Sequence, residues 1–188
     1  TLNVKGQEHA GNLLCNLAKT PENRKYIVEA GSIEPLVALL HTENVTGKLF
    51  AGYVLCRLAE DREHRQRIAE AGAIEPLVAR LRIGCAGEKK WAAWTLSNLS
   101  VYLDNGRRVD EAGGIEPLVE LVTTGCEYGK IYAATALRNL AANPESRKHI
   151  AEAGGIEPLV ALLNTANDDG KLRAAWALNN LSVNNADN

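Results

Sequence analysis

Hydrophobic residues recur along the chain with helical spacing, and the whole pattern repeats every 41 residues. The pentapeptide IEPLV begins at Ile33, Ile74, Ile115 and Ile156, and EAG precedes each copy at the same interval. The period extends back into residues 1–32, and no insertion or deletion interrupts it. A helical pattern with a period of ~40–47 residues is typical of a solenoid, in which each unit buries its apolar face against its neighbours. The sequence therefore predicts an all-α solenoid.

Each unit is predicted to contain three helices. The first is short, as in residues 23–30, and is followed by Gly31, a residue type that suits a left-handed helix stop. The second begins at once with IEPLV, where Pro35 falls in the first turn and removes no intrahelical hydrogen bond. A polar loop then leads to the longest, third helix, for example residues 88–100.

This arrangement resembles the armadillo repeat. The motifs EAGxIEPLVxLL and WxxxN carry the resemblance in combination, and it covers the full chain. HEAT repeats share the period but usually have two helices, without the glycine-marked kink. The resemblance implies a right-handed α-solenoid of three-helix units, similar to the superhelices of importin-alpha and beta-catenin.

We expect one domain over residues 1–188. It divides into a partial unit (1–32), three full units (33–73, 74–114, 115–155) and a last unit (156–188) that lacks its following helix. Because the chain contains no methionine, we also expect it to be a fragment or processed piece of a larger protein.

The third helices are predicted to place three columns of side chains opposite their apolar stripe. At 100° per residue, the positions three before and four after Trp94 lie within about 60° of it, whereas Leu96 and Leu99 point to the core. The first column contains His9, Phe50, Trp91, Tyr132 and Arg173, the second Asn12, Tyr53, Trp94, Thr135 and Trp176, and the third Asn16, Arg57, Asn98, Asn139 and Asn180. Six of the nine aromatic residues of the chain occupy these fifteen positions, and none of the fifteen is aliphatic. Such a face indicates an interaction surface.

The resemblance gives these columns a function. In armadillo proteins the third helices line a concave groove, where the Asn of WxxxN pairs with the main chain of an extended peptide and the Trp walls its side chains. By that likeness the peptide-binding residues are Trp94, Asn98, Asn139, Trp176, Asn180, Trp91, Tyr132, Thr135, Tyr53, Arg57, Phe50, Arg173 and Asn16. The motif is complete only at Trp94/Asn98 and Trp176/Asn180, in units that are not adjacent. The importin-alpha pocket, which holds a lysine between Trp residues of adjacent units, is therefore not expected.

The columns also predict the charge of the ligand. They contain no Asp or Glu, although the chain has 23 acidic residues, and they carry Arg57 and Arg173, with Arg138 as a further candidate beside them. A neutral or acidic peptide is expected, closer to the way beta-catenin is used. The alternative is a structural spacer or assembly module with a vestigial groove, which contacts partners through its convex face or its ends.

Other kinds of chemistry are not indicated. A net charge of −2 gives no basic footprint for nucleic acid or a membrane surface, and no apolar run approaches the ~18 residues of a membrane span. The four histidines have no ligand spacing, no CxxC occurs, and no nucleophile–base pair or phosphate loop stands out. We therefore predict no enzyme, no catalytic residue, no metal and no cofactor.

The cysteines indicate a reducing compartment. They form two equivalent pairs, Cys15 with Cys56 and Cys85 with Cys126, each one unit and therefore ~10 Å apart, too far for a disulfide. Asn98 and Asn180 begin formal glycosylation sequons, but glycans there would block the groove. A cytoplasmic or nuclear location is expected.

Two features lie outside the columns. Lys48, Lys89, Lys130 and Lys171 begin the third helices, where cations oppose the helix dipole; an anionic contact is conceivable, but a solvated face is expected. Apolar surface is expected at the two ends, at Leu2, Val4, Leu13, Leu14, Leu181 and Val183. Weak end-to-end self-association is the predicted consequence.

Overall fold

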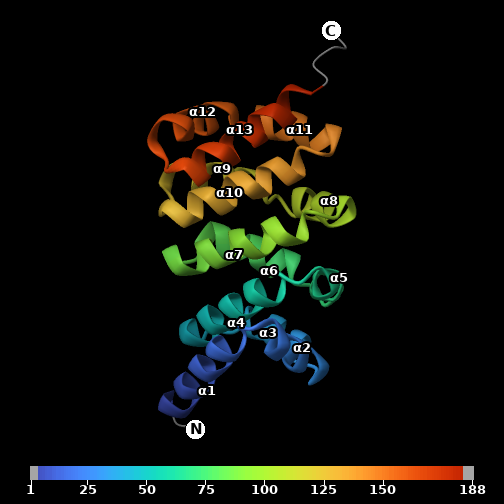
Figure 1. Cartoon of the computed structure of the whole chain (residues 1–188), viewed down its shortest axis with the longest axis vertical. Helices are drawn as coiled ribbons and strands as arrows, with labels where there is room; N and C mark the ends of the chain where they lie inside the picture. The colour runs from blue at the N-terminus through green and yellow to red at the C-terminus, as the bar shows by residue number, and fades with distance from the viewer. Residues whose placement is uncertain (1–3, 184–188) are drawn as a thin grey trace.

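The computed structural model describes residues 4–183, with side chains from residue 9 onward except that of Thr165. This part of the chain forms thirteen α-helices and no strand, stacked along the longest axis of the molecule (Figure 1). The long third helices are α1 (Val4–Leu17), α4 (Val45–Leu58), α7 (Ala86–Leu99), α10 (Glu127–Leu140) and α13 (Asp168–Ser182). The short first helices are α2 (Pro21–Glu29), α5 (Arg62–Glu70), α8 (Leu103–Glu111) and α11 (Pro144–Glu152). The second helices are α3 (Ile33–Leu39), α6 (Ile74–Ile83), α9 (Ile115–Thr124) and α12 (Ile156–Thr165).

The long helices pack on one another from unit to unit, and so do the second helices α6, α9 and α12, which confirms the predicted all-α solenoid. Each long helix lies against the long helix of the next unit, from α1 through α4, α7 and α10 to α13. The short helices follow one edge of this stack, on the right in Figure 1. No helix within residues 4–183 has the length and apolar character needed to cross a membrane.

Glycine ends each short helix, as the sequence predicts. Gly31, Gly72, Gly113 and Gly154 have φ angles of 72°, 79°, 72° and 72°, a left-handed backbone that other residues rarely adopt. The N–H of Ala73, the residue after Gly72, donates to the carbonyl of Ile68, which is the hydrogen bond of a Schellman helix stop. The chain can therefore turn sharply and begin the IEPLV helix two residues after the glycine.

One continuous apolar core runs through the stack. Leu55, Leu96 and Leu137 occupy equivalent positions on three long helices, and each is completely buried. Leu99 is also completely buried, so the predicted core stripe of the third helix is confirmed. Burial of a leucine contributes roughly 1.5–3 kcal/mol, which makes this stripe the main support of each unit.

Arginines in the short helices dock onto the ends of the long helices, a feature that the sequence pattern did not reveal. Arg24, Arg65 and Arg147 donate hydrogen bonds to the carbonyls of Ala18, Ala59 and Ala141, at distances of 3.3, 2.7 and 2.9 Å. Where the third short helix has glycine at this position, Asn105 donates instead to the carbonyl of Leu99 at 3.3 Å. These donors satisfy carbonyls that a helix end leaves unpaired, and the arginines also complement its partial negative charge.

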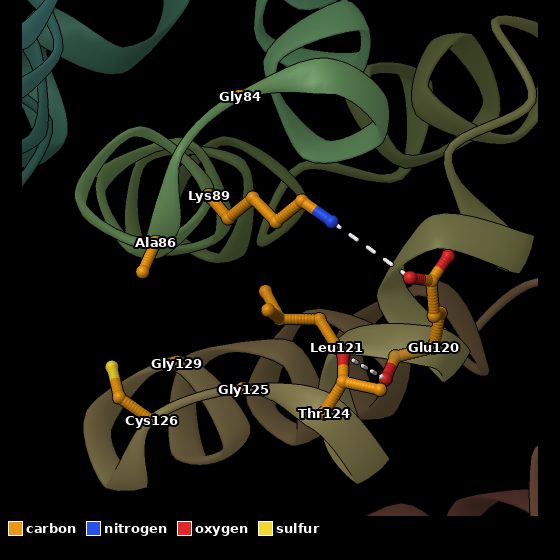
Figure 2. Close-up of a pocket in the computed structure, with 9 residues that line it drawn as sticks. All are labelled: Gly84, Ala86, Lys89, Glu120, Leu121, Thr124, Gly125, Cys126 and Gly129. Atoms are coloured by element: carbon orange, nitrogen blue, oxygen red, sulfur yellow. Dashed lines mark hydrogen bonds and ion pairs between the residues drawn. The ribbon is translucent and has the colours of Figure 1, made fainter.

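The lysine column differs from the expected solvated face. Only Lys171 is exposed, whereas Lys48, Lys89 and Lys130 are half-buried. Figure 2 shows the Lys89 side chain extending from α7 toward Glu120 of α9, with Nζ 3.8 Å from a carboxylate oxygen. The carboxylate of the neighbouring second helix provides the anionic contact that balances a cation at a helix start.

The two ends of the stack expose apolar residues that are buried in the middle. Leu13 and Val54 are equivalent, yet Leu13 is 61% exposed and Val54 is completely buried. At the other end Ile156 is 46% exposed, whereas its equivalent Ile115 is buried. Val183 is exposed as expected and Leu181 is half-buried. Leu2 and the side chain of Val4 lie outside the part that the structure describes.

A titratable cluster joins the last two short helices. Asp110 of α8 accepts a hydrogen bond from the Ser146 hydroxyl at 2.6 Å and lies 3.0 Å from Nδ1 of His149, both on α11. At the preceding junction the residue equivalent to His149 is Arg108, which donates to the carbonyl of Ala69 and keeps its charge at every physiological pH. The hydrogen bond that protonated His149 donates to Asp110, and then the negative charge of Asp110, raise the pKa of His149.

We expect the contact between His149 and Asp110 to stabilise the fold more at low pH than at high pH. A histidine whose pKa is raised in the folded state contributes stability that is fully present below its unfolded pKa of about 6.5 and is lost as pH rises through the folded pKa. The unfolding free energy of the wild type should therefore exceed that of His149→Gln most at about pH 6 and progressively less toward pH 8, in urea titrations at a series of pH values. Glu145 and Glu152 on the same helix also raise the pKa of His149, while Arg107, Glu111 and Glu116 line the surface hollows beside it.

His41→Gln is the matched control, since His41 is exposed in the turn after α3. It should leave the pH dependence unchanged. A difference between wild type and His149→Gln that is the same at every pH would contradict the assignment of the cluster.

Candidate functional site

The fifteen predicted column positions form one face across the long helices, hereafter the column face. None of their side chains is buried: His9, Asn12, Asn16 and Trp176 are exposed and the other eleven are half-exposed. The partial burial arises because these side chains touch their neighbours in adjacent units, as the next contacts show. The column face is therefore an assembled surface rather than a row of separate side chains.

Aromatic rings connect three of the five long helices. The Tyr53 ring meets the Trp91 ring edge-on with centroids 5.0 Å apart, and Trp91 lies 5.9 Å from Trp94. Trp94 in turn stacks on Tyr132 of the next unit, at 4.9 Å and an interplanar angle of 7°. Burial raises the pKa of Tyr132 to about 12, so its hydroxyl stays neutral and can donate a hydrogen bond at physiological pH. These rings form a wall that presents apolar faces with polar edges.

Small residues make room for this wall. Gly52 of α4 lies beneath Trp91, whose Cβ is 3.5 Å from the place where a Cβ of residue 52 would stand. The equivalent Gly11 of α1 lies beneath Phe50, and a Cβ at residue 11 would collide with the Phe50 ring. Phe50 and Trp91 of the first column thus rest on the backbone of the preceding long helix.

Cations cover the tryptophan rings. The guanidinium of Arg57 lies 5.6 Å from the Trp94 ring centroid, and Nζ of Lys90 lies 3.6 Å from that of Trp91. Arg138 and Arg173 both approach Trp176, at 4.8 and 5.4 Å. Each such contact contributes about 0.5–1 kcal/mol at an exposed site. A tryptophan that already holds a cation of its own chain has less to offer a lysine of a ligand.

The asparagine column is partly used within the protein. Asn139 donates through Nδ2 to the carbonyl of Ser97 at 2.8 Å, and Asn180 donates in the same way to the carbonyl of Arg138 at 2.9 Å. Asn98 differs, because its Nδ2 is buried and has no hydrogen-bond partner. Each bonded amide keeps one N–H and its carbonyl oxygen for a ligand. A ligand carbonyl can reach Nδ2 of Asn98 only after a neighbouring side chain moves.

Three other column residues also have partners in the chain. Thr135 donates its hydroxyl hydrogen to the carbonyl of Ile131 at 2.8 Å, so it offers a ligand only acceptor capacity. Asn16 accepts a hydrogen bond from Lys19 at 2.8 Å. Arg57 pairs with Glu60 at 2.6 Å and donates to the carbonyl of Lys19 at 3.2 Å.

Two residues next to the columns were missed by the sequence analysis. Tyr128 extends the aromatic wall, with its ring 6.3 Å from Tyr132, and Lys90 covers Trp91. Tyr128 stands four residues before Tyr132 on the same helix, a spacing at which side chains meet. That spacing is the signal that could have identified it.

The hollow at the turns before α7 and α10 lies outside the column face. The hollow of Figure 2 is lined by residues such as Lys89, Glu120 and Cys126, at the turns that precede α7 and α10, and none of its lining residues belongs to the column face. The Asp110–Ser146–His149 cluster is not a nucleophile–base pair, since Ser146 is buried and its hydroxyl donates to Asp110. Within the described residues, no group of three His, Cys, Asp or Glu could hold a metal ion.

Comparison with known proteins agrees with the architecture. The sequence profile of the Armadillo/beta-catenin-like repeat matches residues 20–48, 107–142 and 143–183, which together exceed half of the chain. No curated protein sequence matches the chain significantly.

Three solved structures illustrate the likeness. An engineered protein is 31% identical, with a TM-score of 0.86 over 97% of this chain and 77% of its own. A computationally designed armadillo repeat protein for modular peptide recognition is 30% identical, with a TM-score of 0.86 over 95% of this chain and 76% of its own. A designed armadillo repeat protein in complex with the peptide (KR)4 is 30% identical, with a TM-score of 0.83 over 96% of this chain and 77% of its own. With the 41-residue units and their glycine stops, these matches show that the chain belongs to the armadillo repeat family.

Proposed function

We propose that the chain is a protein-interaction scaffold that binds an extended peptide segment of a partner along the column face. The observation that carries this proposal is the wall of half-exposed rings from Tyr53 to Tyr132, flanked by asparagines with unused polar groups. A peptide bound there would place its side chains against the rings and its main chain at the amides. The structural neighbours support a peptide as ligand, since one is described as designed for peptide recognition and another was solved with a peptide.

The proposed ligand is neutral or acidic. The column face contains no acid, and the acids that contact it, Glu60 and Asp169, are already paired with Arg57 and Arg173. One structural neighbour was solved in complex with the basic peptide (KR)4, whereas the column face of this chain carries arginines and no acid. Opposite charge across an interface favours encounter and disfavours like-charged partners.

The remaining assignments follow from the scaffold. The armadillo repeat is typically non-enzymatic, and we extend this to the present chain, with one solenoid over residues 1–188. We place it in the cytoplasm or nucleus. Free cysteines support this location, and so do the two sequon asparagines, since Nδ2 of Asn98 is buried and that of Asn180 is hydrogen-bonded.

A spacer or assembly module is the second candidate. The observation in its favour is that Asn139 and Asn180 donate to carbonyls of the preceding long helix, so the column face partly satisfies itself. Partners would then bind the ends or the convex side.

Two substitutions separate these functions. Trp176→Ala and Asn98→Ala should each weaken binding of a partner peptide by about 1–3 kcal/mol, as expected for interface anchors. Neither should cost much stability, because Trp176 is exposed and Nδ2 of Asn98 has no bond to lose. Leu96→Ala should instead lower the unfolding free energy by about 2–5 kcal/mol. Calorimetric titration and urea unfolding measure the two effects.

Tyr26→Ala is the control, since Tyr26 is an exposed aromatic residue on the short helix α2. It should bind peptide like the wild type. If Trp176→Ala and Asn98→Ala also bind like the wild type, the spacer is the better assignment.

The exposed end residues support weak end-to-end association. Leu13 and Ile156 lie at positions that a neighbouring unit covers elsewhere in the stack, so a second copy placed head to tail would bury part of this surface. Light scattering over a concentration series should show a gradual rise in mean mass. Leu13→Glu should remove the rise, and a strict monomer at millimolar protein would contradict the proposal.

A further inference from the structure

Two Arg–Trp contacts lie at the column face, one made by Arg57 of the third column and one by Arg138, which stands beside that column one residue before Asn139, and they differ in what else holds the arginine. In both, an arginine of one long helix covers a tryptophan of the next: Arg57 with Trp94, and Arg138 with Trp176. The tryptophans are the two that belong to complete WxxxN motifs, and they lie two units apart. What these two contacts imply for a ligand rests on the proposed function, in which the column face binds a peptide.

The terminal nitrogens of Arg57 are already engaged. Nη1 lies 2.6 Å from Glu60 and Nη2 donates to the carbonyl of Lys19, while Nε has no hydrogen-bond partner but is buried and out of reach of a ligand. Trp94 is likewise engaged, because Tyr132 stacks on it at 4.9 Å. A ligand acid at this place would have to displace Glu60, an acid of the chain itself.

The Arg138 contact is open. Within residues 4–183 the Arg138 guanidinium has no acid or carbonyl partner, and none of its nitrogens is among the buried unpaired atoms. Trp176 beneath it is 41% exposed. The backbone carbonyl of Arg138 is held by Asn180, which fixes the base of the side chain.

A second arginine gives this place a surplus of one positive charge. Arg173 approaches the same Trp176 ring at 5.4 Å and pairs with Asp169 at 3.0 Å, within one turn of α13. Two guanidinium groups and one carboxylate leave one charge unbalanced. A guanidinium that contacts a ring without another hydrogen-bond partner keeps its N–H groups free, and these match the two oxygens of a carboxylate.

We infer that the column face recognises a single carboxylate side chain of its peptide ligand, and that it does so at Arg138 and Trp176 rather than at Arg57. The aromatic or aliphatic residue of the ligand lies on the wall formed by Trp91, Trp94 and Tyr132. Trp94 on α7 and Trp176 on α13 are two helix steps of ~8–10 Å apart, and an extended peptide advances ~3.3 Å per residue, so the two ligand residues are separated by about five to six positions. Arg138 is thus the residue that determines acid specificity, and Glu60 acts as a built-in acid at the other contact.

The experiment uses synthetic peptides of uniform Gly/Ser background, with one Phe fixed and one Glu moved to each position on either side. Fluorescence polarisation of labelled peptides gives the affinity of each. Wild-type protein should prefer Glu over Gln by about tenfold at one separation and in one direction, as expected for a charge-assisted hydrogen bond. Arg138→Gln should abolish most of that preference, and Arg57→Gln should retain it.

Two further variants sharpen the test. Glu60→Gln should release Arg57 from its ion pair. Arg24 keeps its pair with Asp61 at 2.6 Å. A second Glu in the peptide, placed two units away from the first so that it reaches Arg57, should then strengthen binding severalfold. Arg62→Gln removes the same charge from an exposed position on α5 and should change nothing. Circular dichroism of each variant verifies folding. If Arg138→Gln does not fold, Arg173→Gln replaces it in the test, because it removes the other positive charge beside Trp176.

The outcomes separate this inference from the proposed function. If Phe peptides bind but their affinity does not depend on Glu, or depends on it equally in Arg138→Gln, the inference is wrong and peptide binding stands. If wild-type protein binds none of the peptides, with or without Glu, the peptide-binding function itself fails. If a phosphoserine peptide binds more than tenfold more tightly than the Glu peptide, the proposed recognition of a carboxylate is wrong, since a dianion would then be the preferred group.

Discussion

The unbroken 41-residue register is the constraint on which the whole molecule depends. Because every unit has the same length, a side chain on one long helix meets a predictable partner on the next, and the core and the column face stay aligned together. Trp94 meets Tyr132, and Asn139 meets the carbonyl of Ser97, through the same step along the stack. One residue inserted within a long helix would rotate the following side chains by about 100° and so shift both the buried leucines and the aromatic wall.

Features that arise within one helix were predicted from the sequence. Helical periodicity identified the buried side of α7, with Leu96 and Leu99, and glycine at each helix stop follows from the backbone conformation needed there. The pairing of polar groups could not be predicted, because it depends on the distance between helices and on side-chain rotamers. That Asn139 is bonded within the chain, and that Nδ2 of Asn98 is not, became visible only with neighbouring helices in place.

Units of similar backbone are joined by different side-chain contacts in this stack. Short helices dock by arginine at Arg24, Arg65 and Arg147, but by Asn105 in the remaining unit, and one junction between short helices depends on His149. Armadillo architecture therefore fixes where units meet but not how strongly they hold. Variation at the edge of the stack leaves the long helices, and with them the column face, in the same arrangement.

Glycine beneath the first column has a consequence for the pitch of the stack. Gly11 and Gly52 let the long helices approach until Phe50 and Trp91 rest on backbone, whereas alanines take the same place further along, at residues 93 and 134. The spacing of the long helices and the length of two extended peptide residues differ slightly. This difference accumulates from unit to unit, so peptide residues and units stay aligned only over a short length. The size of one side chain per unit thus sets how many peptide residues can remain in phase with the units before contact is lost.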